Sequence, residues 1–316
     1  MENNLVIFIV GNRSIMFAAE GNDAVLLDIY IYRGGEAIPD HVTHVYVANL
    51  SAVPARAFRH HPNIEEVECD AGVEKIEEFA FDNCASLKRV IMPGVKKVEW
   101  WAFHLCRALT YIECGKLEII GMSAFSLCQS LSSIDLPSIM IVGCQAFRDC
   151  KNLTSVIFGK DLESIRADAL RNCHSLERIT LPLKNGMMTR DNIFQGCVKL
   201  NHIDLVEGEI LDETVTALLM EEWKNDMNEE IDSISQILPN TPAGTIERHD
   251  DVGEKAREIR AWIGSVLRKI VRYRAEHQRT LDEAAAALQP ALPNDIVLKN
   301  VLAFLELPSY TFDGEN

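Results

Sequence analysis

The chain has 316 residues, of which 47% are hydrophobic and 25% are charged, so it has the composition of an ordinary globular protein. This composition excludes a wholly disordered chain and a collagen-like fibre. The chain has 47 Asp and Glu residues against 31 Lys and Arg residues, and its net charge of −16 disfavours nucleic acid and anionic membranes as partners. The sequence also has no apolar run long enough to predict a membrane-spanning helix.

Residues 1–41 predict a β-structured amino-terminal cap. Three apolar segments, Leu5–Val10, Ser14–Ala18 and Ala24–Tyr32, are separated by Gly-Asn pairs and followed by a Gly-Gly pair. The first segment is too short for a secretory signal and no Lys or Arg precedes Arg13, so we interpret it as a buried strand. We therefore expect a cytoplasmic protein whose thiols stay reduced.

Residues 42–206 repeat one pattern at steps of 22 to 24 residues. In six copies a Cys stands three residues after a central residue, usually Phe, and a segment of the form Leu-x-x-Ile-x-Leu follows. A copy this short cannot bury its own apolar face, so successive copies must stack around one continuous core. The central pairs of the seven copies are Ala57-Phe58, Ala80-Phe81, Ala102-Phe103, Ala124-Phe125, Ala146-Phe147, Ala169-Leu170 and Ile193-Phe194.

The repeat also predicts the structure of each rung. The alternation in Leu-x-x-Ile-x-Leu indicates a strand, which hydrogen-bonds to the equivalent strand of the next copy. We interpret the Ala-Phe-x-x-Cys stretch as a short helical turn that closes the other side of the coil, with the Phe at the centre of the rung. The segment Val42–Val47 repeats the strand half alone and predicts a truncated first rung. These features predict a right-handed solenoid of about seven to eight rungs.

The segment Ile120–Pro137 carries the pattern Ile-Gly-x-x-Ala-Phe-x-x-Cys-x-x-Leu-x-x-Ile-x-Leu-Pro nearly whole. This pattern resembles the BspA-like leucine-rich repeat, and the resemblance covers roughly residues 42–206. It implies a leucine-rich-repeat solenoid. Bacterial proteins with this repeat are surface adhesins, but proteins that share the repeat differ widely in role, so the resemblance specifies the fold and leaves the function open.

Residues 207–306 predict a helical carboxy-terminal region, followed by a tail at 307–316. Apolar residues recur there at helical spacing, and Asp212 can cap the first helix. The fold class is therefore α+β repeat: a right-handed leucine-rich-repeat solenoid with a β amino-terminal cap and an α-helical carboxy-terminal cap. The expected segments are a helix at Leu211–Leu238, a loop at 239–253, a second helix at about Glu254–Gln289 and a third at about Asn294–Glu306.

The charges of the two long helices are segregated. Residues 206–254 hold 14 acidic and 2 basic side chains, whereas residues 255–279 hold 8 basic and 2 acidic ones. One interpretation is an antiparallel pair whose opposite charges face each other across an apolar seam. The other is an exposed basic face for an acidic partner, formed by Arg268, Lys269, Arg272, Arg274 and Arg279.

Three segments of the carboxy-terminal region also resemble the tails of a set of diatom leucine-rich-repeat proteins. These segments are residues 221–227, 273–277 and 304–312. The resemblance spans almost the whole chain and implies an intracellular repeat protein without a known reaction.

The sequence lacks the motifs of phosphate-binding loops, zinc proteases, serine hydrolases and EF-hands, and it has no Cys-x-x-Cys pair. We therefore expect no enzyme, no cofactor and no metal. The Cys of each rung is expected to pack as a small apolar residue. We expect no disulfides, because equivalent Cβ atoms of stacked rungs lie about 5 Å apart, too far for an unstrained bond. Cys144 lies outside these positions and is the best candidate for an exposed thiol.

The outer side chains of the strands are the candidate binding surface, because residues that flank the central Ile point outward and stack from rung to rung. Arg and Tyr among them are typical interface anchors. A merely solvated face remains the alternative. Trp100 is a second exposed candidate, whereas we expect Trp101 to pack on Phe79. The candidate residues on the strands are Glu66, Glu68, Arg89, Tyr111, Glu113, Asp135, Arg178 and Asp204.

The sequence thus predicts a non-enzymatic module that binds a protein partner through a rigid ladder of strands. Two alternatives stay open. The first is a structural or self-assembling protein that associates through its charged carboxy-terminal helices. The second and more remote one is an enzyme with an unrecognised pocket at the junction of solenoid and helices, which would need a cluster of convergent titratable residues.

Overall fold

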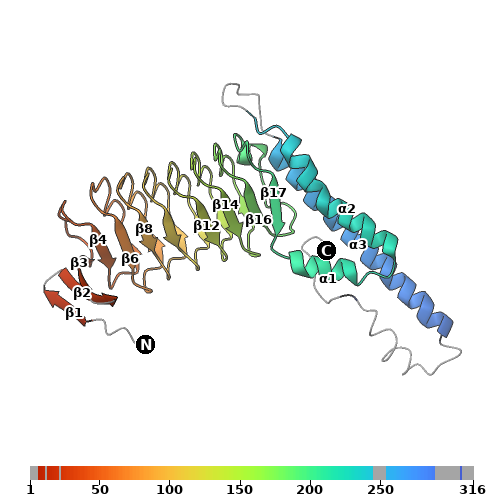
Figure 1. The fold of residues 1–316 in the computed structure, drawn as a ribbon, viewed down its shortest axis with the longest axis horizontal. Helices are drawn as coiled ribbons and strands as arrows, with labels where there is room; N and C mark the ends of the chain where they lie inside the picture. The colour runs from red at the N-terminus through yellow and green to blue at the C-terminus, as the bar shows by residue number, and fades with distance from the viewer. Residues whose placement is uncertain (1–5, 11–12, 21–22, 245–253, 289–306, 308–316) are drawn as a thin grey trace.

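The computed structural model describes residues 6–10, 13–20, 23–244, 254–288 and 307, with side chains for residues 29–244, 254–287 and 307 (Figure 1). The chain begins with an antiparallel meander, which confirms the predicted β cap. Its last strand pairs in parallel with β4 and so covers the edge of the first rung. The strands of this region are β1 (Val6–Val10), β2 (Arg13–Glu20), β3 (Asp23–Tyr32) and β4 (His44–Val47).

The Leu-x-x-Ile-x-Leu segments form a stack of parallel, in-register strands, as the repeat predicted. Tyr111 lies opposite Arg89, and Ile157 lies opposite Asp135. The ladder of hydrogen bonds is interrupted once, between β10 and β12, so the stack divides into two sheets. Its further strands are β6 (Glu66–Cys69), β8 (Arg89–Ile91), β10 (Tyr111–Glu113), β12 (Ser133–Leu136), β14 (Ser155–Phe158), β16 (Arg178–Leu181) and β17 (His202–Leu205).

A second sheet of six parallel two-residue strands runs along the solenoid, and the sequence analysis did not predict it. Each strand ends on the apolar residue five positions before the central residue of its rung, and that apolar side chain is buried. Two residues are too few to show strand alternation in a sequence. These strands are β5 (Ala52–Val53), β7 (Lys75–Ile76), β9 (Lys97–Val98), β11 (Ile119–Ile120), β13 (Ile141–Val142) and β15 (Ser164–Ile165).

The Ala-Phe-x-x-Cys stretch is not helical in the first six copies, so this prediction was wrong. Residues two before and two after the central residue have positive φ, as in Phe79 (58°) and Asn83 (58°), and these angles end any helical path. The backbone N–H groups of the turn bond across rungs, so Phe81 N donates to Ala102 O at 2.7 Å. The seventh copy instead contains a short 3-10 helix, η1 (Asp191–Phe194).

The central Phe side chains form one stacked spine, as predicted. Neighbouring rings lie 4.7, 5.0, 5.1 and 5.5 Å apart between centroids, with planes within 5° of parallel. Each ring is at most 1% exposed. Stacked aromatic pairs contribute about 0.5–1.5 kcal/mol beyond their burial, so the spine links the first five rungs to one another. The five rings are those of Phe58, Phe81, Phe103, Phe125 and Phe147.

The recurring Cys side chains pack beside this spine and confirm the structural role expected for them. Cys84 Sγ donates to Phe58 O at 2.9 Å, and Cys150 Sγ donates to Phe125 O at 3.1 Å. The same thiol-to-carbonyl bond recurs at Cys106, Cys128, Cys173 and Cys197. Burial raises the pKa of Cys84 and of Cys150 to about 12, so these thiols stay protonated. All nine cysteines are free, and Cys144 alone among them is partly exposed.

The carboxy-terminal region contains α1 (Gly208–Thr216), α2 (Glu221–Ile237), the 3-10 helix η2 (Leu238–Asn240) and α3 (Lys255–Leu288). The predicted single helix at Leu211–Leu238 was wrong. Leu218 is turned into the core, and Met220 has extended backbone angles, which breaks the helix in two. Asp212 lies inside α1 and does not cap it. The predicted third helix at 294–306 and the tail lie outside the described residues, except for Leu307.

Candidate protein-binding surface

The strand ladder presents the predicted candidate residues on the outside of the solenoid. Along each strand the burial alternates, so that Val67 and Val90 are buried while the candidates beside them are exposed. Tyr111 and Ile157 are each 45% exposed. The exposed candidates are Glu66, Glu68, Arg89, Tyr111, Glu113, Asp135 and Arg178, and Asp204 is partly exposed.

The structure brings three of these residues together in the first half of the ladder. The Arg89 guanidinium lies over the Tyr111 ring, 4.8 Å from its centroid. The Tyr111 hydroxyl donates to Glu113 Oε2 at 3.3 Å. Cation–π contacts of this kind contribute about 0.5–1 kcal/mol at exposed sites, so the tyrosine is oriented before any partner arrives.

A hollow lies beside this cluster, over β3, β4, β6 and β8. His44 and Tyr46 were not among the predicted candidates, although the alternation of the truncated first rung places both outward. Burial, and then the negative charges of Asp70 and Glu68, raise the pKa of Tyr46, so this phenol stays neutral. The outward side chains that line the hollow are Ile29, His44, Tyr46, Glu66, Glu68, Arg89 and Ile91.

A second cluster lies at the other end of the ladder. Arg178 Nη1 donates to both carboxylate oxygens of Asp204 at 2.7 Å, and His202 Nε2 lies 3.1 Å from Asp204 Oδ1. The interruption between β10 and β12 separates this cluster from Arg89 and Tyr111. Asp135 lies between the two clusters on β12, next to the exposed Ile157.

Trp100 lies outside the ladder, in the turn that follows β9, and it is 55% exposed. Trp101 packs on Phe79, with ring centroids 5.9 Å apart, as the equivalent positions of these residues in neighbouring rungs predicted. Arg56 and Arg59 lie over the other side of this pair, 5.5 and 5.2 Å from the Phe79 centroid. The two tryptophans therefore have different roles, and Trp100 is the one available to a partner.

The turn side of the solenoid carries a polar network that the sequence analysis missed. Asp82, which is 4% exposed, accepts from Arg59 Nε and contacts His104 Nδ1, both at 2.9 Å. Ser126 occupies the equivalent position one rung beyond His104, but its hydroxyl donates to Arg148 O at 3.2 Å. These residues therefore join neighbouring rungs and do not assemble a serine–histidine–aspartate relay.

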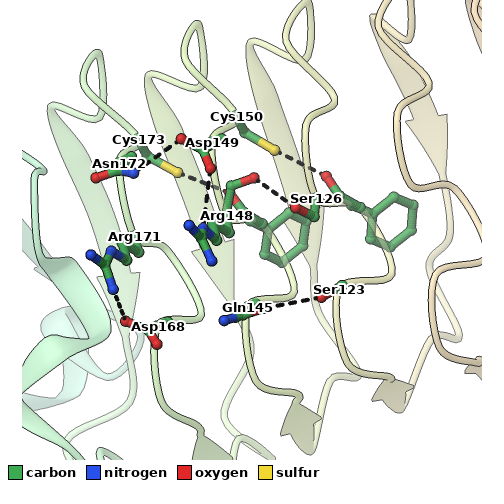
Figure 2. A network of polar contacts seen from close by, with 12 residues as sticks. Ser123, Ser126, Gln145, Arg148, Asp149, Cys150, Asp168, Arg171, Asn172 and Cys173 are labelled. Atoms are coloured by element: carbon green, nitrogen blue, oxygen red, sulfur yellow. Dashed lines mark hydrogen bonds and ion pairs between the residues drawn. The ribbon is translucent and has the colours of Figure 1, made fainter. Parts of the chain in front are cut away.

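Figure 2 shows this network in the later rungs, where each contact joins residues of neighbouring rungs or of the same rung. Asn172 Nδ2 donates to Asp149 Oδ1 at 3.0 Å, and Arg171 Nη1 donates to Asp168 Oδ1 at 3.3 Å. Asn172 and Asp149 lie about one period apart in the sequence, and this spacing is the signal that could have found their contact. Arg171 and Asp168 lie within one rung, so the period gives no signal for theirs.

The charged helices pair partly with each other, as the first interpretation of their segregation expected. Lys269 Nζ lies 3.0 Å from Asp226 Oδ1 and 2.9 Å from Glu230 Oε2 on α2. Arg272 and Arg279 pair with acidic residues one turn later on α3 itself. Arg274 is partly buried, and Arg268 is exposed. The proposed basic face is thus largely neutralised within the chain.

The junction of solenoid and helices has a hollow. Its titratable residues are the two cations Lys184 and Arg260, beside Met187, Met188 and Ile263. Among the described residues, no three His, Cys, Asp or Glu side chains form a possible metal site. In that same part of the chain, no helix combines the length and the apolar character needed to cross a membrane.

The repeat identifies the family. The model of the BspA-type leucine-rich repeat region matches residues 51–141 and 118–214 with six copies, which together make up just over half of the chain. The chain therefore belongs to this family of leucine-rich-repeat proteins. The resemblance of the carboxy-terminal segments to diatom proteins stays a prediction, since all three segments lie beyond the matched residues.

Several solved structures of bacterial leucine-rich-repeat proteins are similar to the chain. The leucine-rich repeat protein of T. pallidum is 29% identical over 55% of this chain and 82% of its own, with a TM-score of 0.45. A leucine-rich repeat protein of Bacteroides ovatus is 25% identical over 64% of this chain and 54% of its own, also with a TM-score of 0.45. No curated protein matches the chain.

Proposed function

We propose that the protein is a non-enzymatic binding module whose strand ladder docks a partner protein. The observation that carries this proposal is the exposed Tyr111 ring held beneath the Arg89 guanidinium. Tyr and Arg are the residues that most often dominate binding energy at protein interfaces. Because both are already oriented on a rigid strand, docking costs little conformational entropy.

The neighbouring hollow supports the same surface. Ile29 and Ile91 supply apolar wall, while Glu66 and Glu68 supply charge close to Arg89. An interface with an apolar centre and a polar rim has this composition. The partner that fits would insert an apolar side chain between Tyr46 and Ile91 and place a basic group against the glutamates.

The experiment uses the full chain as bait in an extract of its source cell. A partner captured by the wild-type chain should be lost from a Tyr111→Ala/Arg178→Ala double variant, because one change removes the aromatic anchor and the other removes the second cluster. Val198→Ala is the matched control, since Val198 is 63% exposed but lies outside the strands. Equal recovery with the double variant, shown to be folded by circular dichroism, would remove the ladder from the proposal.

Self-association through the charged helices has less support, because Lys269, Arg272 and Arg279 already pair within the chain. A cytoplasmic location belongs to the proposal as well, and cell fractionation with an antibody against the chain tests it. Recovery from the culture medium or from the cell surface would contradict that part.

A further inference from the structure

The sheet of two-residue strands forms a second face of the solenoid, which we call the short-strand face. It consists of the outward residues of β7, β9, β11, β13 and β15 and the residue before each of these strands. It also includes the turn residues that lie four and three positions before the central residue of each rung. The column four positions before the centre changes from acid through glycine to base along the solenoid. From the second rung to the seventh it contains Glu77, Glu99, Gly121, Gly143, Arg166 and Arg190.

The middle of this face is apolar. In the rungs of β11 and β13, Ile119 and Ile141 occupy the position that Lys75 and Lys97 hold in the two rungs before. Glycine replaces glutamate in the same two rungs, and the partly exposed Glu118, just before β11, is the charge that remains beside these strands. A Cβ on Gly143 would lie 2.7 Å from the backbone of Gly121, which keeps this position free of side chains.

Large exposed apolar side chains border this middle. Trp100 is 55% exposed and Met122 is 45% exposed, one rung apart at equivalent positions. The next two positions of that column are the smaller Cys144 and Ala167, both partly exposed. From the third rung to the sixth, the side chains of this column therefore become smaller, while the charge of the neighbouring column changes from negative to positive.

The basic end of the face lacks ionic partners. Arg166 and Arg190 are exposed and make no ion pair among the described residues, and the same holds for the exposed Glu163. At the other end, Glu99 is bound by Lys75 and Lys97, and Lys96 lies at the rim beside Glu74. In the column four positions before the centre, one end thus carries glutamates, of which Glu99 is paired with two lysines, and the other end carries arginines without ionic partners among the described residues.

We propose that the short-strand face binds a second copy of this chain in antiparallel orientation. The two-fold axis would lie in the interface, parallel to β11 and β13 and midway between them. This operation keeps each column opposite itself and reverses the order of the rungs, so it places the third rung on the second copy's sixth rung. It sets Trp100 opposite the small Ala167, Ile119 opposite Ile141, and Glu99 opposite Arg166.

The complementarity identifies the occupant. One rotation matches large with small side chains in one column, apolar with apolar ones in a second, and acids with bases in two others, where Glu99 faces Arg166 and Lys96 faces Glu163. It also sets Glu118 opposite the uncharged Met140. A partner of different sequence would not require the side chains at one end of the face to complement those at the other end. The strand ladder lies on a different side of the rung and stays open, so this inference goes beyond the proposed partner binding and does not depend on it.

Cross-linking at Cys144 tests the orientation directly. The two Cys144 thiols would lie one rung apart, about 5 Å along the solenoid, and the other eight cysteines are buried. A short bismaleimide should therefore convert the native chain into a covalent dimer, and Cys144→Ala should abolish this product. Sedimentation equilibrium of the uncross-linked chain should show a concentration-dependent dimer. A strict monomer at every concentration would overturn the proposal.

Charge reversal tests the pairing. Lys96→Glu and Glu163→Lys should each weaken dimerisation, and the double variant should restore it, because the exchange recreates the pair across the axis. Trp100→Lys should raise the dimer dissociation constant at least about tenfold, whereas Val198→Lys, on an exposed apolar residue elsewhere, should not change it. A dimer that is insensitive to Trp100→Lys, or a double variant as weak as the single ones, would rule out this surface.

Discussion

The solenoid and the carboxy-terminal helices are held together by different kinds of contact. In the core of the solenoid the repeated contacts are neutral: stacked Phe rings, thiol-to-carbonyl bonds and backbone ladders. Ion pairs such as Lys75–Glu99 join rungs only outside this core. The helices join the last rung through charged groups as well. The buried Lys255 ammonium donates to the carbonyls of Leu200 and Leu238, and Arg260 binds Asp191. Salt and acid should therefore leave the buried core of the solenoid largely intact while they weaken the anchoring of the helices.

The charged contacts add to an apolar seam and do not replace it. Trp223 stacks on Tyr273 at 5.7 Å, and Ile259, Ile263 and Val266 of α3 are almost fully buried. Burial of such side chains contributes about 1.5–3 kcal/mol each, whereas an exposed ion pair contributes at most about 1 kcal/mol. The seam thus stabilises the hairpin shown in Figure 1, and the charges fix its register on the solenoid.

The largest expected effect comes from cutting the spine. Phe125→Ala removes a fully buried ring between two stacked neighbours. The rungs on either side cannot collapse into the space, because the sheet of short strands and the backbone bonds of the turns hold them apart. The free energy of unfolding in urea should fall by about 3–5 kcal/mol. Phe125→Leu should cost clearly less, since the sixth rung already carries Leu170 at this position. A loss below about 1 kcal/mol would show that the spine is not the main link between rungs.

Alkali should act on the solenoid through its thiols. Burial raises the pKa of Cys84 and Cys150 from 9.0 to about 12, so the folded state keeps protons that the unfolded state releases. Their contribution is fully present below pH 9 and is lost as the pH rises toward 12. Replacing Cys84 with Ala should reduce the slope of unfolding free energy against pH in this range by about 1.4 kcal/mol per pH unit.

The slope is compared with that of Ser133→Ala, an exposed change on the ladder, whose pH dependence should match the wild type. An unchanged slope in Cys84→Ala would mean that the thiol ionises without unfolding the rung.

The repeat explains why so much of the solenoid could be predicted. Each position recurs in several rungs, so a single deviation such as Leu170 does not hide the spine, and the alternation of the ladder placed Arg89 and Tyr111 outward. Their mutual contact also follows from the period, because residues 22 apart lie side by side in the stack. Arg178 and Asp204 lie 26 residues apart, and no register argument alone would have paired them.

The errors of prediction have the opposite origin. Phe79 and Trp101 adopt positive φ, which neither residue favours, because hydrogen bonds to the next rung impose the turn. The break between α1 and α2 occurs among good helix formers, and only the buried position of Leu218 explains it. Both features are set by tertiary contacts, and in the helical region no repeat compensates for a misleading local signal.

A smaller effect is expected from the ionic contacts of the hairpin. Lys269 bridges Asp226 and Glu230 at 3.0 and 2.9 Å, and it is partly buried. Lys269→Met keeps the aliphatic stem and removes the charge, so it should lower the unfolding free energy by about 1 kcal/mol. This difference should shrink in 1 M salt, which screens charges beyond about 3 Å. The effect of Phe125→Ala should persist in the same salt, and equal salt dependence of the two variants would contradict the contrast between the regions.

The smallest effect should appear in acid, at the contact between α3 and the last rung. A hydrogen bond from Arg260, with further attraction from Arg257, lowers the pKa of the Asp191 carboxyl below its ordinary value. A depressed carboxyl pKa contributes stability that is present above about pH 4 and is lost as the pH falls through the folded-state pKa. Asp191→Asn removes this contribution at neutral pH, so the helical circular dichroism of the variant should depend less on pH below 4 than that of the wild type.

Asp212→Asn, on the exposed side of α1, should leave the acid dependence unchanged. If Asp191→Asn and the wild type lose their helical signal in parallel, the anchoring of α3 to the solenoid is apolar alone.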